Sequence, residues 1–339
     1  MLLFVQALLP TPSIAASTTS AAASASSQVT TTHCHNPTLN LIVLGSGGPE
    51  LNDQRASTGY LLREGERARI LIDFGAGSAS TFEKVRAQIS DLKAVLLSHL
   101  HVDHTNDLPA LVKASFFSNR THDLPILGPS GNDVVPDTTT FIQRLFGERG
   151  AWSYLSDFLT GDARFQLRPQ TINAQLPKGI PERTFEPFTT TIDGYTLRAI
   201  GVSHGLMPSL AWRIEKDGCS VVISGDTSNI GHTLDPLVRG ADLFIAHNAV
   251  PEKTRDPIAL RLHMPPSEIG RIAAQGQPHT LVLSHFMQRS RFVQRQTRAY
   301  IQQHYNGPIL FSFDGDRYDL ATGKRTPMSK LDISPDKQR

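Results

Sequence analysis

The sequence predicts an α/β protein in which two β-sheets lie face to face and helices cover their outer sides. Two observations lead to this prediction. Apolar runs typical of buried strands fill residues 39–98 and return after residue 191, and the stretch between them has helical patterns. The chain has 339 residues, of which 39% are hydrophobic and 19% charged, so it is long enough for one large domain or two small ones.

The first strand-rich part contains four expected strands and one helix. An apolar run at 39–44 stops at a glycine-rich turn, and further runs follow at 58–62 and 69–73. A helix is expected at 80–89, followed by a buried strand at 93–98. This last strand leads directly into a cluster of histidines.

The central part, residues 105–190, has a different character. It is rich in aromatic residues, and helical patterns occur at 108–117, 139–146 and 152–159. We therefore expect a helical insertion between the two strand-rich parts. Its aromatic residues either pack this helical layer against the rest of the domain or form an apolar wall over a site.

The second strand-rich part follows residue 191 and contains one expected helix, at 267–275. Its expected strands are 195–202, 209–215, 220–224, 243–246, 280–284 and 309–313. After residue 321 the chain becomes polar. We expect 322–339 to be a loose tail.

The N-terminal segment has the composition of an export signal. Residues 1–32 contain no acidic or basic side chain, and an apolar run at 2–9 is followed by small residues suited to cleavage. The run is too short to span a bilayer. We expect a signal peptide at 1–25, a linker at 26–38 and a secreted or periplasmic protein. The alternative is a disordered tail on an intracellular protein.

The two cysteines, Cys34 and Cys219, are too few for a zinc ribbon or a disulfide scaffold. Cys34 precedes the first expected strand, and Cys219 lies in an expected hairpin turn. Nothing in the sequence shows that these two points meet, so we expect two free thiols. A disulfide is the alternative if the protein is exported.

The charges of the chain are nearly balanced. There are 33 Lys and Arg against 31 Asp and Glu, which gives a formal net charge of +2. No stretch is a block of basic residues, as a protein that binds nucleic acid usually has, and no stretch is apolar enough for a membrane span. We therefore expect neither nucleic acid nor a membrane as a partner.

The strongest chemical signal is the segment SHLHVDH at 98–104. It holds three histidines and one aspartate directly after an expected strand, where the backbone can turn so that neighbouring side chains converge. Asp226 follows another apolar strand, and His204 and His285 also stand at strand ends. Imidazole and carboxylate ligands suit Zn²⁺, Mn²⁺ or Fe²⁺, so these residues predict a metal site.

These residues resemble the metallo-β-lactamase superfamily in motif and in order. The resemblance implies an αββα four-layer sandwich over residues 39–321, with two metal ions in a cleft at one edge of the sheets. The ions are expected to be zinc, with manganese or iron as alternatives. Asp226 would bridge the two ions. The other implied ligands are His99, His101 and His204 for the first ion, and Asp103, His104 and His285 for the second.

The same resemblance implies roles for further residues. Asp73 would accept an imidazole N–H beneath the histidine cluster, and His247 would line the site. His263, in LHMPP at 262–266, is our candidate general acid, and Asp103 is expected to act in catalysis as well as to bind metal. The alternatives are a turn or helix-cap role for Asp73 and a helix-entry role for His263.

Two branches of the superfamily share segments with this chain. SGDT at 224–227, SHF at 284–286 and LHMPP resemble ribonuclease Z and its relatives. That branch carries a long arm that grips transfer RNA between the positions of His204 and Asp226, and the short interval here leaves no room for it. The segments 55–60, 108–117 and 128–132 resemble the zinc-dependent arylsulfatase group, whose members are typically exported.

The resemblance implies a dinuclear hydrolase in which the metal ions lower the pKa of a shared water towards about 7, so that hydroxide attacks an ester. We expect an aryl sulfate, a small anionic ester, as the substrate. The alternative is a phosphodiesterase acting on small or cyclic phosphodiesters, because both esters are monoanionic and tetrahedral. A third hypothesis is a metal-binding module without catalysis. The relatives also suggest a homodimer.

Overall fold

The computed structural model describes residues 34–176 and 186–330. The expected signal peptide at 1–25 and most of the expected linker lie outside the described residues, as do 331–339 at the end of the expected tail. Within the described ranges, no helix combines the length and the apolar character needed to cross a bilayer.

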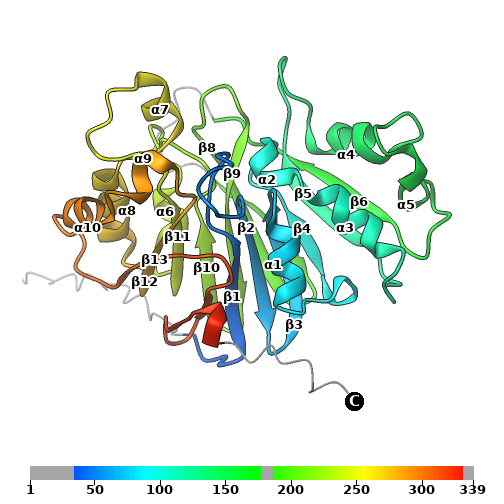
Figure 1. Ribbon diagram of the computed structural model, residues 1–339, viewed down its shortest axis with the longest axis horizontal. Helices are drawn as coiled ribbons and strands as arrows, with labels where there is room; N and C mark the ends of the chain where they lie inside the picture. The colour runs from blue at the N-terminus through cyan, green and yellow to red at the C-terminus, as the bar shows by residue number, and fades with distance from the viewer. Residues whose placement is uncertain (1–33, 177–185, 331–339) are drawn as a thin grey trace, which may run out of the picture. The chain divides into compact units, whose positions relative to one another are not determined.

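Two β-sheets form the centre of the domain (Figure 1). The strands of the first sheet are β1 (Leu39–Gly45), β2 (Gly59–Glu64), β3 (Arg67–Phe74), β4 (Ala94–Leu96), β5 (Leu124–Pro129), β6 (Leu167–Ile172), β14 (Arg317–Asp319) and β15 (Arg325–Thr326). Their order across the sheet is β15-β14-β1-β2-β3-β4-β5-β6.

The second sheet has the order β13-β12-β11-β10-β9-β8-β7. Its strands are β7 (Phe188–Ile192), β8 (Tyr195–Val202), β9 (Ser209–Lys216), β10 (Cys219–Ile223), β11 (Leu243–His247), β12 (Thr280–Ser284) and β13 (Ile309–Phe311). The strands from β3 to β6 pair in parallel, as do those from β10 to β13.

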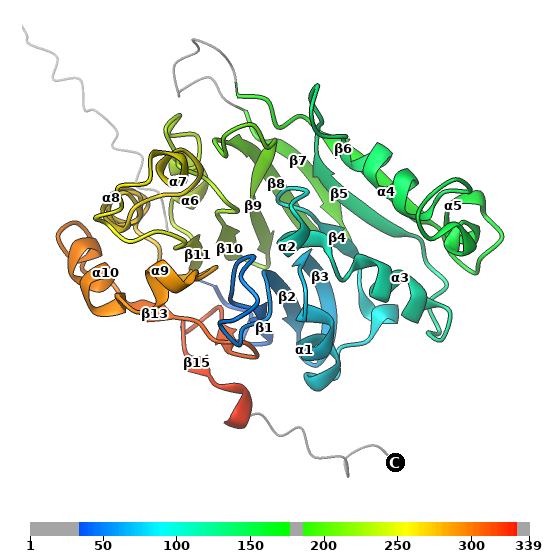
Figure 2. The same ribbon diagram turned by 45° about the horizontal axis from the view of Figure 1, so that its top comes forward.

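Helices cover the outer face of each sheet (Figures 1 and 2). The first sheet carries α1 (Ser78–Lys84), α3 (Leu108–Ser115), α4 (Thr138–Phe146) and α5 (Asp157–Thr160), whose apolar side chains pack on it. The second carries α6 (Asp235–Val238), α8 (Pro266–Gly276) and α10 (Gln294–Ile301). The remaining α-helices are the short α2 (Val102–Thr105), α7 (Pro257–Leu262) and α9 (Gln288–Arg291).

The apolar runs of the sequence explain these layers. In β1, Leu41 and Val43 point into the core between the sheets, whereas Ile42 and Leu44 pack beneath the helices. Successive side chains of a strand point to opposite faces, so a strand covered on both sides must be apolar throughout. The predicted α/β fold, with two sheets face to face and helices outside, is confirmed.

The stretch 105–190 differs from the helical insertion that we expected. It contains α3, α4 and α5, but it also supplies β5, β6 and β7, two of which extend the first sheet. The residues of β5 include Pro125 and Pro129, and β6 includes Pro169. Proline lacks an amide donor and weakens the pattern of a strand, which is why these strands were not expected.

The expected loose tail is also partly ordered. Its residues Arg325–Thr326 form β15, which pairs antiparallel with β14. A short 3₁₀ turn follows at Met328–Lys330. A two-residue edge strand in a polar segment has no apolar period that the sequence could reveal.

A disulfide joins Cys34 to Cys219, so the expectation of two free thiols is wrong. Their Cα atoms are 4.0 Å apart, although the residues are separated by 185 positions. Asp242 explains the contact, because its carboxylate accepts the backbone N–H of Cys34 at 3.3 Å and that of Ser220 at 2.7 Å. This carboxylate fixes the segment before β1 beside the first residues of β10.

Candidate metal centre

The predicted metal ligands lie together at one edge of the two sheets. The strands β3 and β4 of the first sheet end there, and so do β8, β10, β11 and β12 of the second. Side chains at the carboxyl ends of parallel strands meet at the same edge, which brings distant segments into one site. All predicted site residues lie here and are buried or half-buried: Asp73, His99, His101, Asp103, His104, His204, Asp226, His247, His263 and His285.

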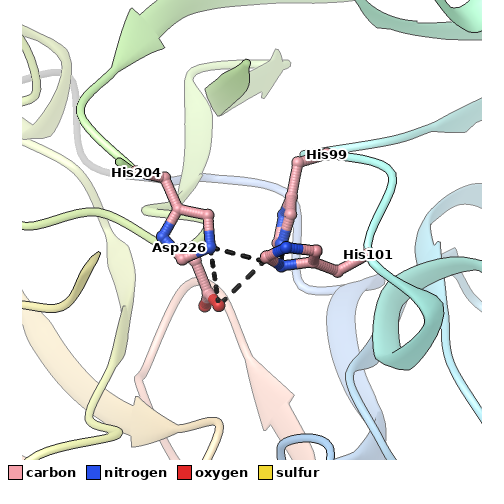
Figure 3. A group of neighbouring side chains, drawn as sticks. All are labelled: His99, His101, His204 and Asp226. Carbon is pink, nitrogen blue, oxygen red and sulfur yellow. Dashed lines mark hydrogen bonds and ion pairs between the residues drawn. The ribbon is translucent and has the colours of Figure 1, made fainter. Parts of the chain in front are cut away.

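His99, His101, His204 and Asp226 form the first group (Figure 3). The two histidines from the first sheet and the two residues from the second point toward one another in the figure. His99 Nε2 lies 2.9 Å from His101 Nδ1, and His204 Nε2 lies 3.3 Å from the same atom. Ligands about 2.1 Å from a tetrahedral ion are separated by roughly 3.4 Å, so these spacings suit a shared cation.

Asp103, His104 and His285 form the second group, whose ligand atoms also lie within 4.8 Å of one another. Asp103 Oδ2 is 3.4 Å from His285 Nε2 and 3.5 Å from His104 Nε2. Helix α2 places Asp103 and His104 next to each other immediately after the 98–101 turn. The backbone of His285 has a φ of 55°, which turns its ring back toward the cluster from the end of β12.

Asp226 lies between the two groups. Its Oδ2 atom is 3.2 Å from His285 Nε2, 3.7 Å from both His104 Nε2 and His204 Nε2, and 3.9 Å from His99 Nε2. One carboxylate oxygen thus faces imidazole nitrogens of both groups. This is the placement that a bridging ligand requires.

Buried hydrogen bonds orient several of these rings. Asp73 accepts Ser98 N–H and Ser98 Oγ–H, each at 2.7 Å, and its Oδ2 lies 2.8 Å from His104 Nδ1. The Leu262 carbonyl, 2.9 Å from His204 Nδ1, accepts its proton. In both rings the bonded Nδ1 leaves Nε2 free to face the centre, which is how ligand histidines are usually oriented.

His247 contacts the other oxygen of Asp226. Its Nδ1 is 2.7 Å from Asp226 Oδ1, and its Nε2 is 2.9 Å from the hydroxyl of Tyr60. Tyr60 lies on β2 and is fully buried. Sequence reasoning missed Tyr60, because it stands inside an apolar strand with no polar neighbour to mark it.

His263 lies beside both groups. Its Nδ1 is 3.9 Å from Asp226 Oδ2 and has no hydrogen-bond partner. The centroid of its ring is 5.4 Å from that of His204 and 5.8 Å from that of His285. His263 follows the last residue of α7 and stands three positions before the first residue of α8, so it lies at a helix entry and also beside the predicted ligands.

Burial keeps several of these histidines neutral. It lowers the pKa of His99 well below its usual value, and also lowers that of His101 and of His204, where neighbouring histidines add to the effect. Burial likewise lowers the pKa of His247 to about 4 and that of His263 to about 3. A neutral imidazole has the free lone pair that metal binding requires.

The two carboxylates among the predicted ligands, Asp103 and Asp226, are ionised. Burial alone would raise the pKa of Asp226, but the facing His285 and His263 hold it well below its usual range. Burial opposes ionisation of Asp103 in the same way, and His104 and His285 lower its pKa to about 2. Burial would also lower the pKa of His285, which the charge of Asp226 raises to about 9. The centre therefore holds two carboxylates whose ionised form the surrounding imidazoles stabilise.

The donor set fits divalent metal ions. His104 Nε2, His263 Nδ1 and both ring nitrogens of His285 are buried without a hydrogen-bond partner. Buried polar atoms are normally satisfied, and a group of unsatisfied imidazole nitrogens around ionised carboxylates indicates that a cation belongs there. Nitrogen and oxygen ligands without cysteine favour zinc, manganese or iron.

Close backbone packing supports the turn that carries Asp103. A Cβ atom at Gly75 would lie 1.9 Å from the Asp103 carbonyl oxygen, so only glycine fits there. Asp73, two residues earlier, has a φ of 52°. The end of β3 is thus shaped to let the 98–104 segment pass directly over it.

A further cluster of possible ligands has another explanation. His232, Asp235 and Glu268 also lie close together. Arg271 donates to Asp235 Oδ2 and to Glu268 Oε1 at 2.7 Å each, and to His232 Nδ1 at 2.9 Å. Because a guanidinium already neutralises these carboxylates, we assign no metal to this cluster.

Comparison with known proteins agrees with this geometry. Residues 68–286 match the model of the beta-lactamase superfamily domain. Ribonuclease Z of Mycobacterium bovis (strain BCG / Pasteur 1173P2) is 28% identical over 295 residues, which cover 83% of this chain and 98% of that protein.

Two solved structures share the fold. The metallo-beta-lactamase fold protein YhfI from Bacillus subtilis aligns with a TM-score of 0.61 and 23% identity, over 83% of this chain and 98% of its own. The short form of human tRNase Z aligns with a TM-score of 0.62 and 20% identity, over 83% and 99%. At these identities the likeness shows the fold.

These relatives correct two expectations. The finer resemblance to arylsulfatases is not supported, because the relatives carry the name ribonuclease Z. The expectation that excluded nucleic acid as a partner is contradicted, since these relatives are named for cleaving RNA. A sequence without a basic block does not exclude nucleic acid as a partner, because folding can bring basic side chains from distant segments together. The αββα sandwich, the matched domain and the two histidine–aspartate groups lead to one conclusion: the chain belongs to the metallo-β-lactamase superfamily.

Proposed function

We propose that this protein hydrolyses phosphodiester bonds with the help of two divalent metal ions. The observation that carries the proposal is Asp226 Oδ2, which faces imidazole nitrogens of both groups within 3.9 Å. Asp226 would contact both ions. His99, His101 and His204 would hold the first, and Asp103, His104 and His285 the second.

A pair of ions in such a site supplies a water of lowered pKa and neutralises charge on the oxygens of the reacting centre. The protein's own side chains have separate roles. Asp226 and Asp103 provide the negative charge that retains cations, and Asp73 and Leu262 keep the rings of His104 and His204 in place.

His263 is the residue that we propose as general acid. Its unpartnered Nδ1 faces the centre beside Asp226 Oδ2. Burial lowers the pKa of the ring to about 3 although the charge of Asp226 partly opposes this, so the ring needs a further anion beside it in order to hold a second proton. A bound phosphodiester supplies this anion. The proton would then pass to the oxygen of the leaving group.

The relatives support phosphodiesters over aryl sulfates as substrates, since their names place them among ribonucleases. The interval between His204 and Asp226 is fully described and holds β9, β10 and their turns. It contains no long arm of the kind expected for gripping transfer RNA. This observation favours short or single-stranded RNA ends and small diesters over a whole folded RNA.

The proposal is tested by comparing three substrates on one preparation loaded with zinc or manganese. These are bis-p-nitrophenyl phosphate, p-nitrophenyl sulfate and a short RNA with a single-stranded 3′ end. We expect kcat/KM to be highest for the phosphodiesters. Faster turnover of the sulfate would contradict the proposal, and so would metal binding without turnover of any ester.

A further inference from the structure

The strongest unassigned feature of the site is a hydrogen-bonded chain that crosses from one sheet to the other. Tyr60, on β2 of the first sheet, contacts His247 at the end of β11 in the second. His247 in turn contacts Asp226, which follows β10. All three side chains are at most 2% exposed. Polar groups buried this deeply are normally paired with one another.

The donor and the acceptor of each of these hydrogen bonds follow from the chemistry of the groups. An ionised carboxylate can only accept, so His247 donates from Nδ1 to Asp226 Oδ1 over 2.7 Å. The Nε2 atom of the neutral ring then carries a lone pair. Tyr60 donates its hydroxyl proton to that atom over 2.9 Å.

This arrangement decides which oxygen of Asp226 is available. Oδ1 is occupied by His247, whereas Oδ2 faces His285, His104, His204 and His99. If the ring of His247 turned, the carboxylate could rotate and Oδ2 would leave the centre. The hydroxyl of Tyr60 is the contact that anchors the far side of this ring.

We propose that Tyr60 is a positioning residue: its hydroxyl fixes the ring of His247, and through it holds Asp226 with one oxygen directed at the metal ions. Tyr60 itself would touch neither the ions nor the substrate, because its hydroxyl contacts His247 on the side of the ring away from Asp226. Because it comes from the opposite sheet, it also ties the geometry of the centre to the packing of the two sheets. This inference rests on the proposed metal centre but not on the choice of substrate.

The test is Tyr60→Phe, which removes one hydroxyl and leaves the ring. We expect about 10-fold weaker binding of the more loosely held ion, a loss typical of residues that orient metal ligands. Zinc affinity is measured by competition with a chromophoric chelator. The visible spectrum of the Co²⁺-loaded protein reports the ligand geometry directly and is expected to change.

Tyr305→Phe is the matched control. Tyr305 is also buried, and its hydroxyl donates to the Pro278 carbonyl at 2.8 Å. Pro278 precedes β12, at the end of that strand opposite to His285. The same chemical change here is expected to leave zinc affinity and the Co²⁺ spectrum unchanged. Equal losses in both variants would show that only general stability is affected, and would overturn the inference.

A double-mutant comparison tests whether Tyr60 acts through His247. His247→Phe should weaken zinc binding by itself, and adding Tyr60→Phe should then cause no further loss. An undiminished effect of Tyr60→Phe in that background, or wild-type zinc binding by Tyr60→Phe alone, would refute the assignment. These measurements need no substrate. Normal metal binding without phosphodiester turnover would refute only the proposed function, whereas a wild-type chain that binds no metal would refute both.

Discussion

Asp226 is the side chain on which the contacts of the centre converge. Asp226→Ala removes the carboxylate that faces both groups and leaves the surrounding imidazoles without their common partner. We expect loss of bound metal together with a fall in kcat/KM of more than about 100-fold, the upper figure for residues that only orient a ligand. Metal content measured by elemental analysis and turnover of bis-p-nitrophenyl phosphate check this.

His232→Ala is the control for this variant. It removes a half-exposed imidazole from the cluster that Arg271 already neutralises. Metal content and activity should stay at the wild-type level. If Asp226→Ala retained both metal ions, the bridging role would have to be given up.

The contribution of His263 to the rate is predicted to depend on the leaving group. With His263→Ala, the metal content should be unchanged, because the implied ligands remain. General acids typically contribute about 10²–10⁴-fold to rates, so the loss should be large for alkyl leaving groups and small for p-nitrophenolate, which needs no proton. A series of diesters of graded leaving-group pKa measures this slope. An equal loss across the series would exclude the acid role.

The residues of the centre could be predicted to different degrees. The implied ligands stand at strand ends in short polar segments, and strand ends at one edge of a sheet converge. Tyr60 could not be predicted, because its contact with His247 spans 187 positions and depends on how two sheets face each other. The positive φ of Asp73 and His285 was equally invisible, since neither is glycine.

At the level of elements, strands with apolar or alternating patterns were predictable, whereas strands that contain proline or are short and polar were not. β8 and β12 have continuous apolar or alternating patterns that match their observed bounds. β7 has the sequence FTTTI and no buried residue, so nothing distinguishes it from a polar loop. Its existence depends on pairing with β8.

Helix α4 offers a prediction about pH. Asp137 caps this helix by accepting Thr140 N–H at 2.9 Å, and this bond is the main cause that lowers the pKa of Asp137. Because the pKa of Asp137 is lower in the folded protein, the stabilisation is fully present at pH values above the pKa of Asp137 in the unfolded chain. It is lost as the pH falls through the pKa of Asp137 in the folded protein. Asp137→Ala should cost about 0.5–2 kcal/mol at neutral pH, measured by urea unfolding.

Asp137→Asn separates capping from charge. Asparagine caps a helix nearly as well as aspartate but does not titrate. The wild-type advantage over this variant should therefore shrink between about pH 5 and about pH 3. A difference that stayed constant over this range would show that the carboxylate charge does not contribute.

For the whole molecule, the Cys34–Cys219 disulfide closes a loop across 185 positions. The Cys34→Ser/Cys219→Ser double variant should lower the free energy of unfolding by about 2–5 kcal/mol, because its unfolded chain is less constrained. Urea unfolding measures this, and a reducing agent should bring the wild-type protein to the same midpoint. The double variant itself should not respond to the reducing agent.

The disulfide also bears on where the protein functions. Disulfides persist in oxidising compartments and are rare where thiols are kept reduced. We propose that the protein is exported, as the composition of residues 1–32 predicts. The pairing of the two cysteines could not be foreseen from the sequence, because it depends on Asp242, a third segment that fixes both neighbourhoods.

Because the centre draws its side chains from both sheets, it cannot exist in an unfolded chain. Cations that bind only the native form shift the folding equilibrium by mass action, by about 2.7 kcal/mol when their free concentration is 100 times the dissociation constant. The melting temperature of this protein should therefore climb with the zinc supply and drop when a chelator withdraws it. Heat resistance would then serve as a gauge of how much metal the surroundings provide.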